Sequence, residues 1–352
     1  MDNSTPLILL GVLAAVLSWA GVRLIRSYAH GGHLSAPAQG DTAPSTPRGG
    51  GIAILVVVLL IFMPVGLTLA DPAQVVRFAL AGALIGTIGF FDEFRTLPRL
   101  GRIFAQTLAA LIFISAAPIL EIGLPFVNLQ LSVLAGYILS ALWIVVLSNA
   151  YNYMDGIDGL AGGQAVLAGV FWAGIGFVQR DPLVVLLGVL IAGASAGFLV
   201  YNLPPASIIL GDVGATFLGF SLAALPMLTV TRGAPSRLIP SGALIVGLFL
   251  FDAAFTFVRY LLKGQPGSHE HRSHLYQRLV ALGEAPYRVT LLYLLISIGF
   301  GAAGLIYWLS NAWLALLIFL LTCMVLFSWV TYREYAAANV MRQRPEDAKR
   351  HG

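Results

Sequence analysis

The chain has 352 residues, of which 58% are hydrophobic and only 10% are charged, and its formal net charge is +4. Its mean hydropathy is +0.87. Soluble domains carry about 25% charged residues, so this composition excludes a soluble fold. The chain is therefore expected to have the lipid bilayer as its main partner and no nucleic-acid partner.

Apolar runs of about 20 residues, each long enough to cross about 30 Å of hydrocarbon, recur from end to end. They predict an all-α fold, a polytopic membrane helix bundle of about eleven transmembrane helices, with ten as the alternative count. The expected cores are 5–24, 51–70, 76–91, 103–119, 130–148, 160–178, 183–201, 213–231, 238–260, 287–309 and 311–332. We expect residues 1–332 to form a single membrane-embedded domain and residues 333–352 a charged cytoplasmic tail.

Basic residues are concentrated in one set of loops. All but four of the 20 lysines and arginines lie on one side of the predicted bundle, and the exceptions are Arg77, Arg180, Arg232 and Arg237. Because the basic side faces the cytoplasm, the N-terminus is predicted outside and the C-terminus inside. The six histidines also fall on the inner side, so function is expected there.

The first inner loop, residues 30–51, ends in Arg48-Gly-Gly-Gly51 at the mouth of a span. One interpretation is a flexible linker. The other is an anion site, in which glycine N–H groups approach a phosphate and Arg48 supplies positive charge. The second inner loop holds Asp92 and Glu93, followed by Arg95, Arg99 and Arg102. It is either a solvated span end or a place where a divalent cation and a phosphate bind together.

The third inner segment is the most informative. Asn149, Asn152, Asp155 and Asp158 recur every three residues, so several could project to one side if the turn is helical. Polar groups pressed between two spans are costly to desolvate, which favours a site over a set of helix caps. In the fourth segment, Asn202 precedes Gly211-Asp212-Val-Gly214, where Asp212 is either an ordinary N-cap or a ligand-binding carboxylate flanked by glycines.

The fifth inner loop, residues 259–288, contains His269, His271, Arg272 and His274. Its arginines oppose a transition-metal site and suit a phosphate-rich ligand. The inner face as a whole therefore combines oxygen donors for Mg²⁺ with cationic groups for phosphates, which indicates phosphoryl transfer. The oxygen donors are Asp92, Glu93, Asp155, Asp158 and Asp212, and the cationic groups are Arg48, Arg95, Arg272 and His274.

These segments resemble one family, the polyprenyl-phosphate N-acetylhexosamine-1-phosphate transferases of glycosyltransferase family 4, which include the WecA-type initiating enzymes and MraY. The family's Asn-x-x-Asn-x-x-Asp-Gly-x-Asp-Gly-Leu motif is matched in full by Asn149 to Leu160. Its Asp-Asp pair resembles Asp92-Glu93, and its Gly-Asp-x-Gly segment resembles Gly211 to Gly214. The resemblance runs from about Arg48 to Arg288.

The resemblance implies a Mg²⁺-dependent phosphotransferase of the bacterial inner membrane with its active site facing the cytoplasm, where Mn²⁺ is an alternative cation. It would transfer a sugar 1-phosphate from a UDP-N-acetylhexosamine to undecaprenyl phosphate, releasing UMP and initiating O-antigen or related polysaccharide synthesis. Carried over by position, Asp212, Asp155 and Asp92 would serve the metal, and Asp92, Glu93, Asp155 and His274 the catalysis. The substrate-binding set would be Arg48, Asn149, Asn152, Asp158, Asn202 and Arg272.

Two positions depart from the family's pattern, and one of them bears on the branch of the family. Glu93 replaces the second Asp of the pair, and the family's His-x-His-His motif appears as His274-Leu-Tyr276-Gln277. The second departure argues against the peptidoglycan phospho-MurNAc-pentapeptide transferases, which remain the alternative, and favours donors such as UDP-GlcNAc, UDP-FucNAc or UDP-QuiNAc.

The rival of a different class is a transporter that uses Asp252, inside an apolar run, as an ion relay. Asp252 is otherwise expected to pair with Arg259 or to pack near the site. A homodimer is left open.

Overall fold

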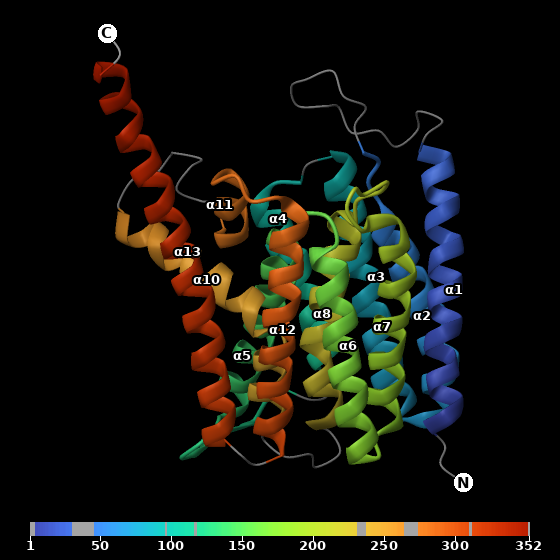
Figure 1. Ribbon diagram of the computed structural model, residues 1–352. Helices are drawn as coiled ribbons and strands as arrows, with labels where there is room; N and C mark the ends of the chain where they lie inside the picture. Colours follow the sequence, from blue (N-terminus) through green and yellow to red (C-terminus); the bar gives the residue numbers. More distant parts are fainter. Residues whose placement is uncertain are drawn as a thin grey trace.

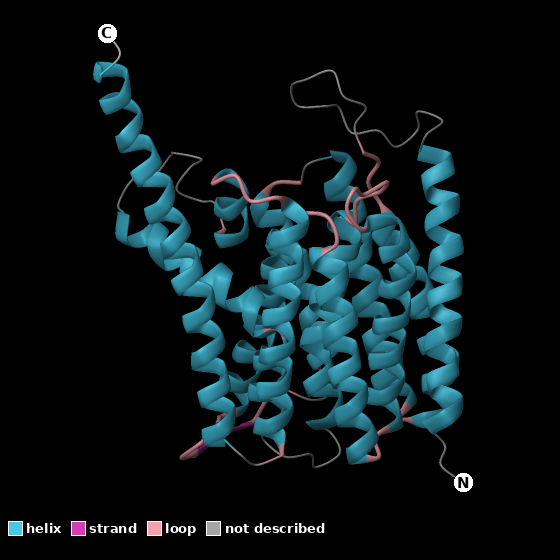
Figure 2. Ribbon diagram, viewed as in Figure 1, coloured by secondary structure: helices cyan, strands magenta, loops and turns pink. Residues whose placement is uncertain are grey.

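The computed structural model describes residues 4–29, 46–95, 97–115, 118–230, 237–263, 274–309 and 312–350. Within these ranges the chain forms thirteen helices and one small hairpin (Figures 1 and 2). The helices are α1 (Ser4–Tyr28), α2 (Gly50–Leu69), α3 (Pro72–Arg95), α4 (Arg99–Ile114), α5 (Val133–Tyr153), α6 (Leu160–Gln179), α7 (Pro182–Asn202), α8 (Gly211–Val230), α9 (Leu238–Ile245), α10 (Gly247–Lys263), α11 (Leu275–Ala281), α12 (Pro286–Trp308) and α13 (Ala312–Arg350). Strands β1 (Glu121–Gly123) and β2 (Asn128–Gln130) pair antiparallel, with Ile122 opposite Leu129. The predicted all-α membrane bundle is confirmed.

By length and apolarity alone, the count among the described residues is below the predicted eleven, and it reaches the alternative count of ten when α9 and α10 are taken together. Nine helices among the described residues are long and apolar enough to cross a membrane, and ten if α9 and α10 count together. Helix α4, expected as span 103–119, has 16 residues and so rises about 24 Å, short of the hydrocarbon core. The span expected at 238–260 is broken between α9 and α10 by a 75° bend. At the break, the ring of Phe300 occupies the place that a side chain at Gly247 would need.

Helix α8 lies at the centre of the bundle. Of its residues Gly211–Leu228, 94% are buried, and the helix packs against α2, α3, α5, α6, α7 and α9. Helices α1 and α13 lie at opposite edges (Figure 1). Small residues let the backbones meet closely: a side chain at Gly51 of α2 would collide with Gly214 of α8. The first turn of α8 is thereby fixed against the first turn of α2.

Local signals set several helix ends. Asp181 caps α7 by accepting hydrogen bonds from the N–H groups of Leu183 and Val184, and Pro182 occupies the first helical turn. Ser132 caps α5 in the same way. Helix α13 continues without a break to Arg350, so no helix end marks the division expected at residue 332. That division stays a prediction.

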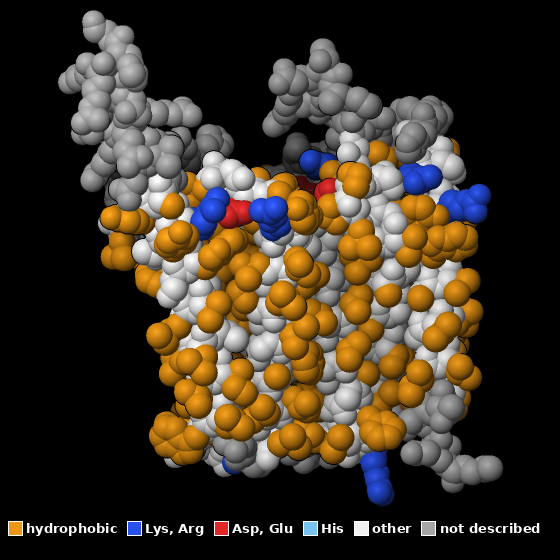
Figure 3. Space-filling view, viewed as in Figure 1, with side chains coloured by type: hydrophobic (Ala, Val, Ile, Leu, Met, Phe, Trp, Pro, Cys, Tyr) orange, Lys and Arg blue, Asp and Glu red, His pale blue; other side chains and the backbone are white. Residues whose placement is uncertain are grey.

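The polar loops gather at one end of the bundle. Hydrophobic side chains cover the flank shown in Figure 3, and the acidic side chains visible there lie at the upper end. The loops that follow α5 and α7 lie at this same end (Figure 2). The chain begins α1 at the lower end and finishes α13 at the upper end (Figure 1). This is the relation expected if the termini lie on opposite sides, while the orientation in the membrane stays a prediction.

Candidate active site

The start of α8 is the centre of the site. Gly211 has φ of 79°, a conformation that favours glycine, and it turns the chain into the helix that carries Asp212. The carboxylate of Glu93, at the end of α3, lies against this glycine. A Cβ placed on Gly211 would be 2.5 Å from Glu93 Oε1 and 2.8 Å from Oε2. Glycine is therefore required here for both backbone conformation and space.

The two carboxylates of the acidic pair have different environments. Asp92 accepts hydrogen bonds from Arg102 Nη1 at 2.6 Å and from the N–H of Leu97 at 2.9 Å. Both oxygens of Glu93 are buried and make no hydrogen bond. The N–H of Val213 faces the Glu93 carboxylate, but its geometry falls short of a hydrogen bond. Asp92 is thus already neutralised by an arginine, whereas Glu93 is a buried acceptor without a donor.

The segment after α5 meets the start of α8 at two points. The Asn152 side chain faces the Asp212 carboxylate, and the N–H of Gly211 faces the Asp155 carboxylate. Burial raises the pKa of Asp155 to about 7, repulsion from Asp212 and Asp158 adds to the rise, and the N–H of Gly211 and the charge of Arg48 oppose it. Glu93, Asp155 and Asp212 therefore form an acidic cluster whose negative charge the neighbouring cationic groups do not fully balance.

Helix α5 ends at Tyr153, so the helical spacing of the motif does not continue. Asn149 points to α4, where its amide donates to Gln106 Oε1 at 2.5 Å and also to the carbonyl of Val145. The expectation that the motif's polar groups project to one side therefore holds for Asn152 and Asp155 only. Gln106 is buried in an apolar helix, and no motif in the sequence marks it as a site residue.

Asp158 and Asn202 hold two loops together. Asp158 Oδ2 accepts from the N–H of Ala206 at 2.9 Å. Asn202 accepts from the N–H of Gly159 at 3.0 Å and donates to the carbonyl of Ile208 at 2.9 Å. Because both ends of the buried Asn202 amide are used internally, its geometry is that of a positioning residue, and its place in the substrate-binding set stays a prediction.

Two N–H groups of the glycine entry before α2 bind within the protein, whereas one interpretation of the sequence assigned them to an anion. Gly50 donates to the carbonyl of Ile209 at 3.0 Å, and Gly51 to that of Leu210 at 2.8 Å. These bonds join Gly50 and Gly51 to the segment that immediately precedes α8. Arg48 is exposed at this junction, and its charge reaches Glu93, Asp155 and Asp212.

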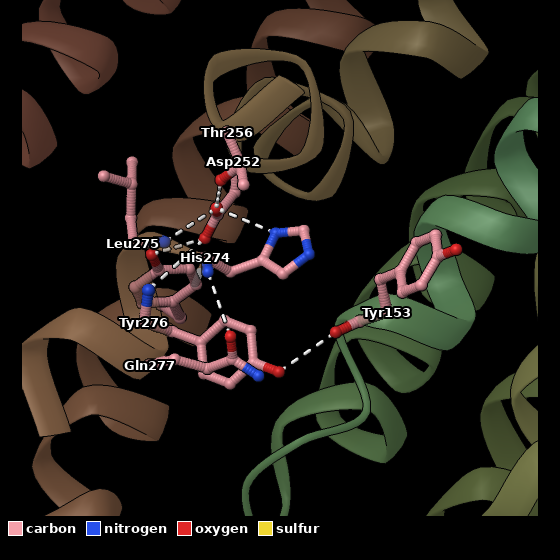
Figure 4. Close-up of polar contacts among 8 residues, drawn as sticks. Tyr153, Asp252, Thr256, His274, Leu275, Tyr276 and Gln277 are labelled. Atoms are coloured by element: carbon pink, nitrogen blue, oxygen red, sulfur yellow. Dashed lines mark hydrogen bonds and ion pairs between the residues drawn. The ribbon is translucent and has the colours of Figure 1, made fainter. Parts of the chain in front are cut away.

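His274 caps the short helix α11 and lies beside the segment that carries Asp155 (Figure 4). Its Nδ1 is 3.2 Å from Oδ1 of Asp252, which is fully buried. Among the described residues, the hydrogen-bond partners of Asp252 lie on α10, α11 and α12 and do not include Arg259. Asp252 therefore packs at the site, the second of the two expectations for it. Arg272 and the rest of residues 264–273 lie outside the described residues, as do residues 30–45.

The residues present fit a magnesium ion that is completed by substrate. No group of three or more His, Cys, Asp or Glu within the described ranges is close enough to hold a metal alone. Mg²⁺, however, is commonly bound through one or two carboxylates, with waters and substrate phosphates as the other ligands. The donor-free Glu93 carboxylate beside Asp155 and Asp212 supplies the oxygen atoms and the uncompensated charge that such an ion needs.

Residues 75–230 match the model of glycosyl transferase family 4, a segment that contains the acidic cluster. A probable undecaprenyl-phosphate N-acetylglucosaminyl 1-phosphate transferase of Bacillus subtilis is 30% identical over 77% of this chain and 76% of its own length.

The chain belongs to glycosyl transferase family 4. Another member, the decaprenyl-phosphate N-acetylglucosaminephosphotransferase of Mycolicibacterium smegmatis, is 31% identical over 86% of this chain and 82% of its own length. The phospho-N-acetylmuramoyl-pentapeptide-transferase of Lactiplantibacillus plantarum is 29% identical over 54% of this chain and 64% of its own. The chain is thus a multi-pass membrane member of glycosyl transferase family 4. Arg48, Asp252 and His274 lie outside the segment matched by the family model and contribute to the site from flanking elements.

Proposed function

We propose that this protein transfers an N-acetylhexosamine 1-phosphate from a UDP-sugar to undecaprenyl phosphate at the cytoplasmic face of the bacterial inner membrane. The observation that carries the proposal is the acidic cluster at the start of α8, at one end of a membrane bundle. A buried carboxylate without a donor, Glu93, is unfavourable unless a ligand completes it. Members of the family with 30% and 31% identity over most of the chain are named as transferases of this kind.

The reaction exchanges one phosphoanhydride bond for another. An oxygen of the lipid phosphate attacks the sugar-bearing phosphorus of the donor, and the bond from that phosphorus to the UMP oxygen breaks. Both substrates carry phosphate charge, so Arg48 and His274 are assigned to hold the diphosphate. Bound Mg²⁺, held by Asp212 with Asp155 and with Glu93 or Asp92, would neutralise charge on the leaving UMP.

The chain's own residues place these groups. Asp92, paired with Arg102, holds the loop between α3 and α4, which keeps Glu93 against Gly211. Asn152 orients Asp212, and Asp158 with Asn202 fixes the loops on either side. We assign Glu93 to the lipid phosphate because it lies at the end of a span, where a headgroup enters from the bilayer.

UDP-GlcNAc or a 6-deoxy relative such as UDP-FucNAc or UDP-QuiNAc is the proposed donor. The relatives named for N-acetylglucosamine transfer cover 77% and 86% of the chain, against 54% for the L. plantarum pentapeptide transferase. Tyr276 and Gln277 also stand where the peptidoglycan branch has histidines. The proposed product would initiate O-antigen or a related surface polysaccharide.

The test uses the full chain purified in detergent, with undecaprenyl phosphate, Mg²⁺ and each UDP-sugar in turn, including UDP-MurNAc-pentapeptide. UMP release with an N-acetylhexosamine donor and none with the pentapeptide donor is expected. Release with the pentapeptide donor alone would assign the chain to the peptidoglycan branch. A folded preparation that releases no UMP from any donor would overturn the proposal.

A further inference from the structure

We propose that Asp252 is a positioning residue that fixes the ring of His274 beside the turn bearing Asp155, an inference that rests on the proposed function. Asp252 has no exposed surface although it belongs to an apolar helix. Its carboxylate accepts from side-chain and backbone donors of three helices (Figure 4): Thr256 Oγ1 at 3.2 Å, His274 Nδ1 at 3.2 Å, Leu275 N at 2.9 Å, Tyr276 N at 3.4 Å and Tyr293 Oη at 2.9 Å.

The contact with Asp252 determines which ring nitrogen of His274 is available. A carboxylate surrounded by donors accepts from each of them, so Nδ1 of His274 carries the proton and donates it. Nε2 is left as the nitrogen that faces the ligand, and it donates to a phosphate oxygen once it carries a proton. The ring is also held between two tyrosines, with centroids 6.0 Å from Tyr153 and 5.9 Å from Tyr276. Its tautomer and its orientation are thus both fixed.

The same carboxylate anchors α11 to the catalytic turn. Asp252 accepts from the N–H groups at the start of α11, and the hydroxyl of Tyr276 then donates to the carbonyl of Tyr153 at 3.0 Å. This hydroxyl also fills the space beside Gly156, next to Asp155. Asp252 is therefore connected to the turn that bears Asp155 through two neighbouring residues, His274 and Tyr276.

This arrangement differs from that of an ion relay. A relay carboxylate must release and regain its ion, which requires an accessible face. Asp252 instead has no exposed surface and is enclosed by donors from its own chain. The geometry matches the arrangement in which a buried carboxylate orients a functional histidine.

The test is a double-mutant cycle on UMP release by the full chain in detergent. Asp252→Asn keeps the shape but replaces one acceptor oxygen by a donor, and a fall in kcat/KM of about 10- to 100-fold is expected. In the His274→Gln background the same change should cost much less, because its effect passes largely through the histidine. An equal fold-loss in both backgrounds would overturn the proposal.

Asp181→Asn is the matched control. It changes a buried N-cap carboxylate at the other end of α7, about 30 Å from Asn202 by helix length. It should lower the melting temperature without lowering kcat/KM. If Asp252→Asn does not fold, the cycle is run with Asp252→Glu, which keeps the acceptor, and the same non-additivity is expected.

A second measurement is independent of turnover. In solid-state ¹⁵N NMR of histidine-labelled protein, the His274 signals are those lost in His274→Gln. The expected result for the neutral ring is a protonated Nδ1 and a bare Nε2, and Asp252→Asn should disturb this state. A His274 tautomer that is unchanged in Asp252→Asn would contradict the inference even if the wild type released UMP. A wild type that shows this tautomer but no UMP release would contradict the proposed function alone.

Discussion

Replacing Gly211 by alanine tests whether the position of the Glu93 carboxylate matters. The residue has φ of 79°, where a side chain costs about 1–2 kcal/mol. The added methyl group would lie 2.5 Å from Glu93 Oε1, whereas ordinary contact begins near 3.5 Å. The carboxylate must therefore move by about 1 Å, a displacement that can cost about 100-fold in rate.

Gly283→Ala provides the control for backbone strain. Gly283 has φ of 92°, but a Cβ there meets nothing within 4 Å. Both variants should lose similar stability in thermal melts, and only Gly211→Ala should lose about 100-fold in kcat/KM for UMP release. If both variants kept wild-type turnover, the Glu93 carboxylate would have no part in the reaction. If both lost turnover equally, backbone strain would be the cause.

Three further predictions concern the same site. Glu93→Gln removes a buried charge that has no donor, so the melting temperature should rise while UMP release falls, and a lower melting temperature would show that the charge is compensated. Asn202→Ala removes two hydrogen bonds between loops and should lower the free energy of unfolding by about 2 kcal/mol, measured by denaturant titration; no change would remove its positioning role. Chelation with EDTA should abolish UMP release, and added Mg²⁺ or Mn²⁺ should restore it, whereas full activity in EDTA would exclude a divalent cation.

The sequence predicts the architecture well because apolar length and the side of the charges are local properties of the chain. It fails where geometry depends on neighbours. The run at 103–119 is apolar enough for a span, yet α4 ends at Ile114. The run at 238–260 shows no break in composition. In the structure, however, the ring of Phe300 of α12 packs against Gly247, where the 75° bend occurs.

The site shows the same limit. The motif from Asn149 to Leu160 indicates the location and the chemistry, but pairing decides which groups remain available. Asp92 and Glu93 look equivalent in the sequence, and only the structure pairs Asp92 with Arg102. The glycines after Arg48 look suited to an anion, yet the N–H groups of Gly50 and Gly51 donate to carbonyl groups of the chain just before α8.

Asp252 is the residue whose position the sequence left most open. An acidic residue inside an apolar run indicates a functional role, but the kind of role cannot be assigned until the partners of the carboxylate are known. Apart from Thr256 of its own helix, those partners come from the start of α11 and from α12, 22 to 41 residues further along the chain. Only the fold brings them together.

The most direct test of the central claim follows the phosphorus atom. UDP-GlcNAc labelled with ³²P in the phosphate next to the sugar is incubated with undecaprenyl phosphate, Mg²⁺ and the purified protein, with the related UDP-sugars run in parallel. The label is expected in the lipid fraction, and the released nucleotide is expected to be unlabelled UMP. Labelled UDP in solution beside an unlabelled glycolipid would show transfer of the sugar alone and would contradict the proposed function.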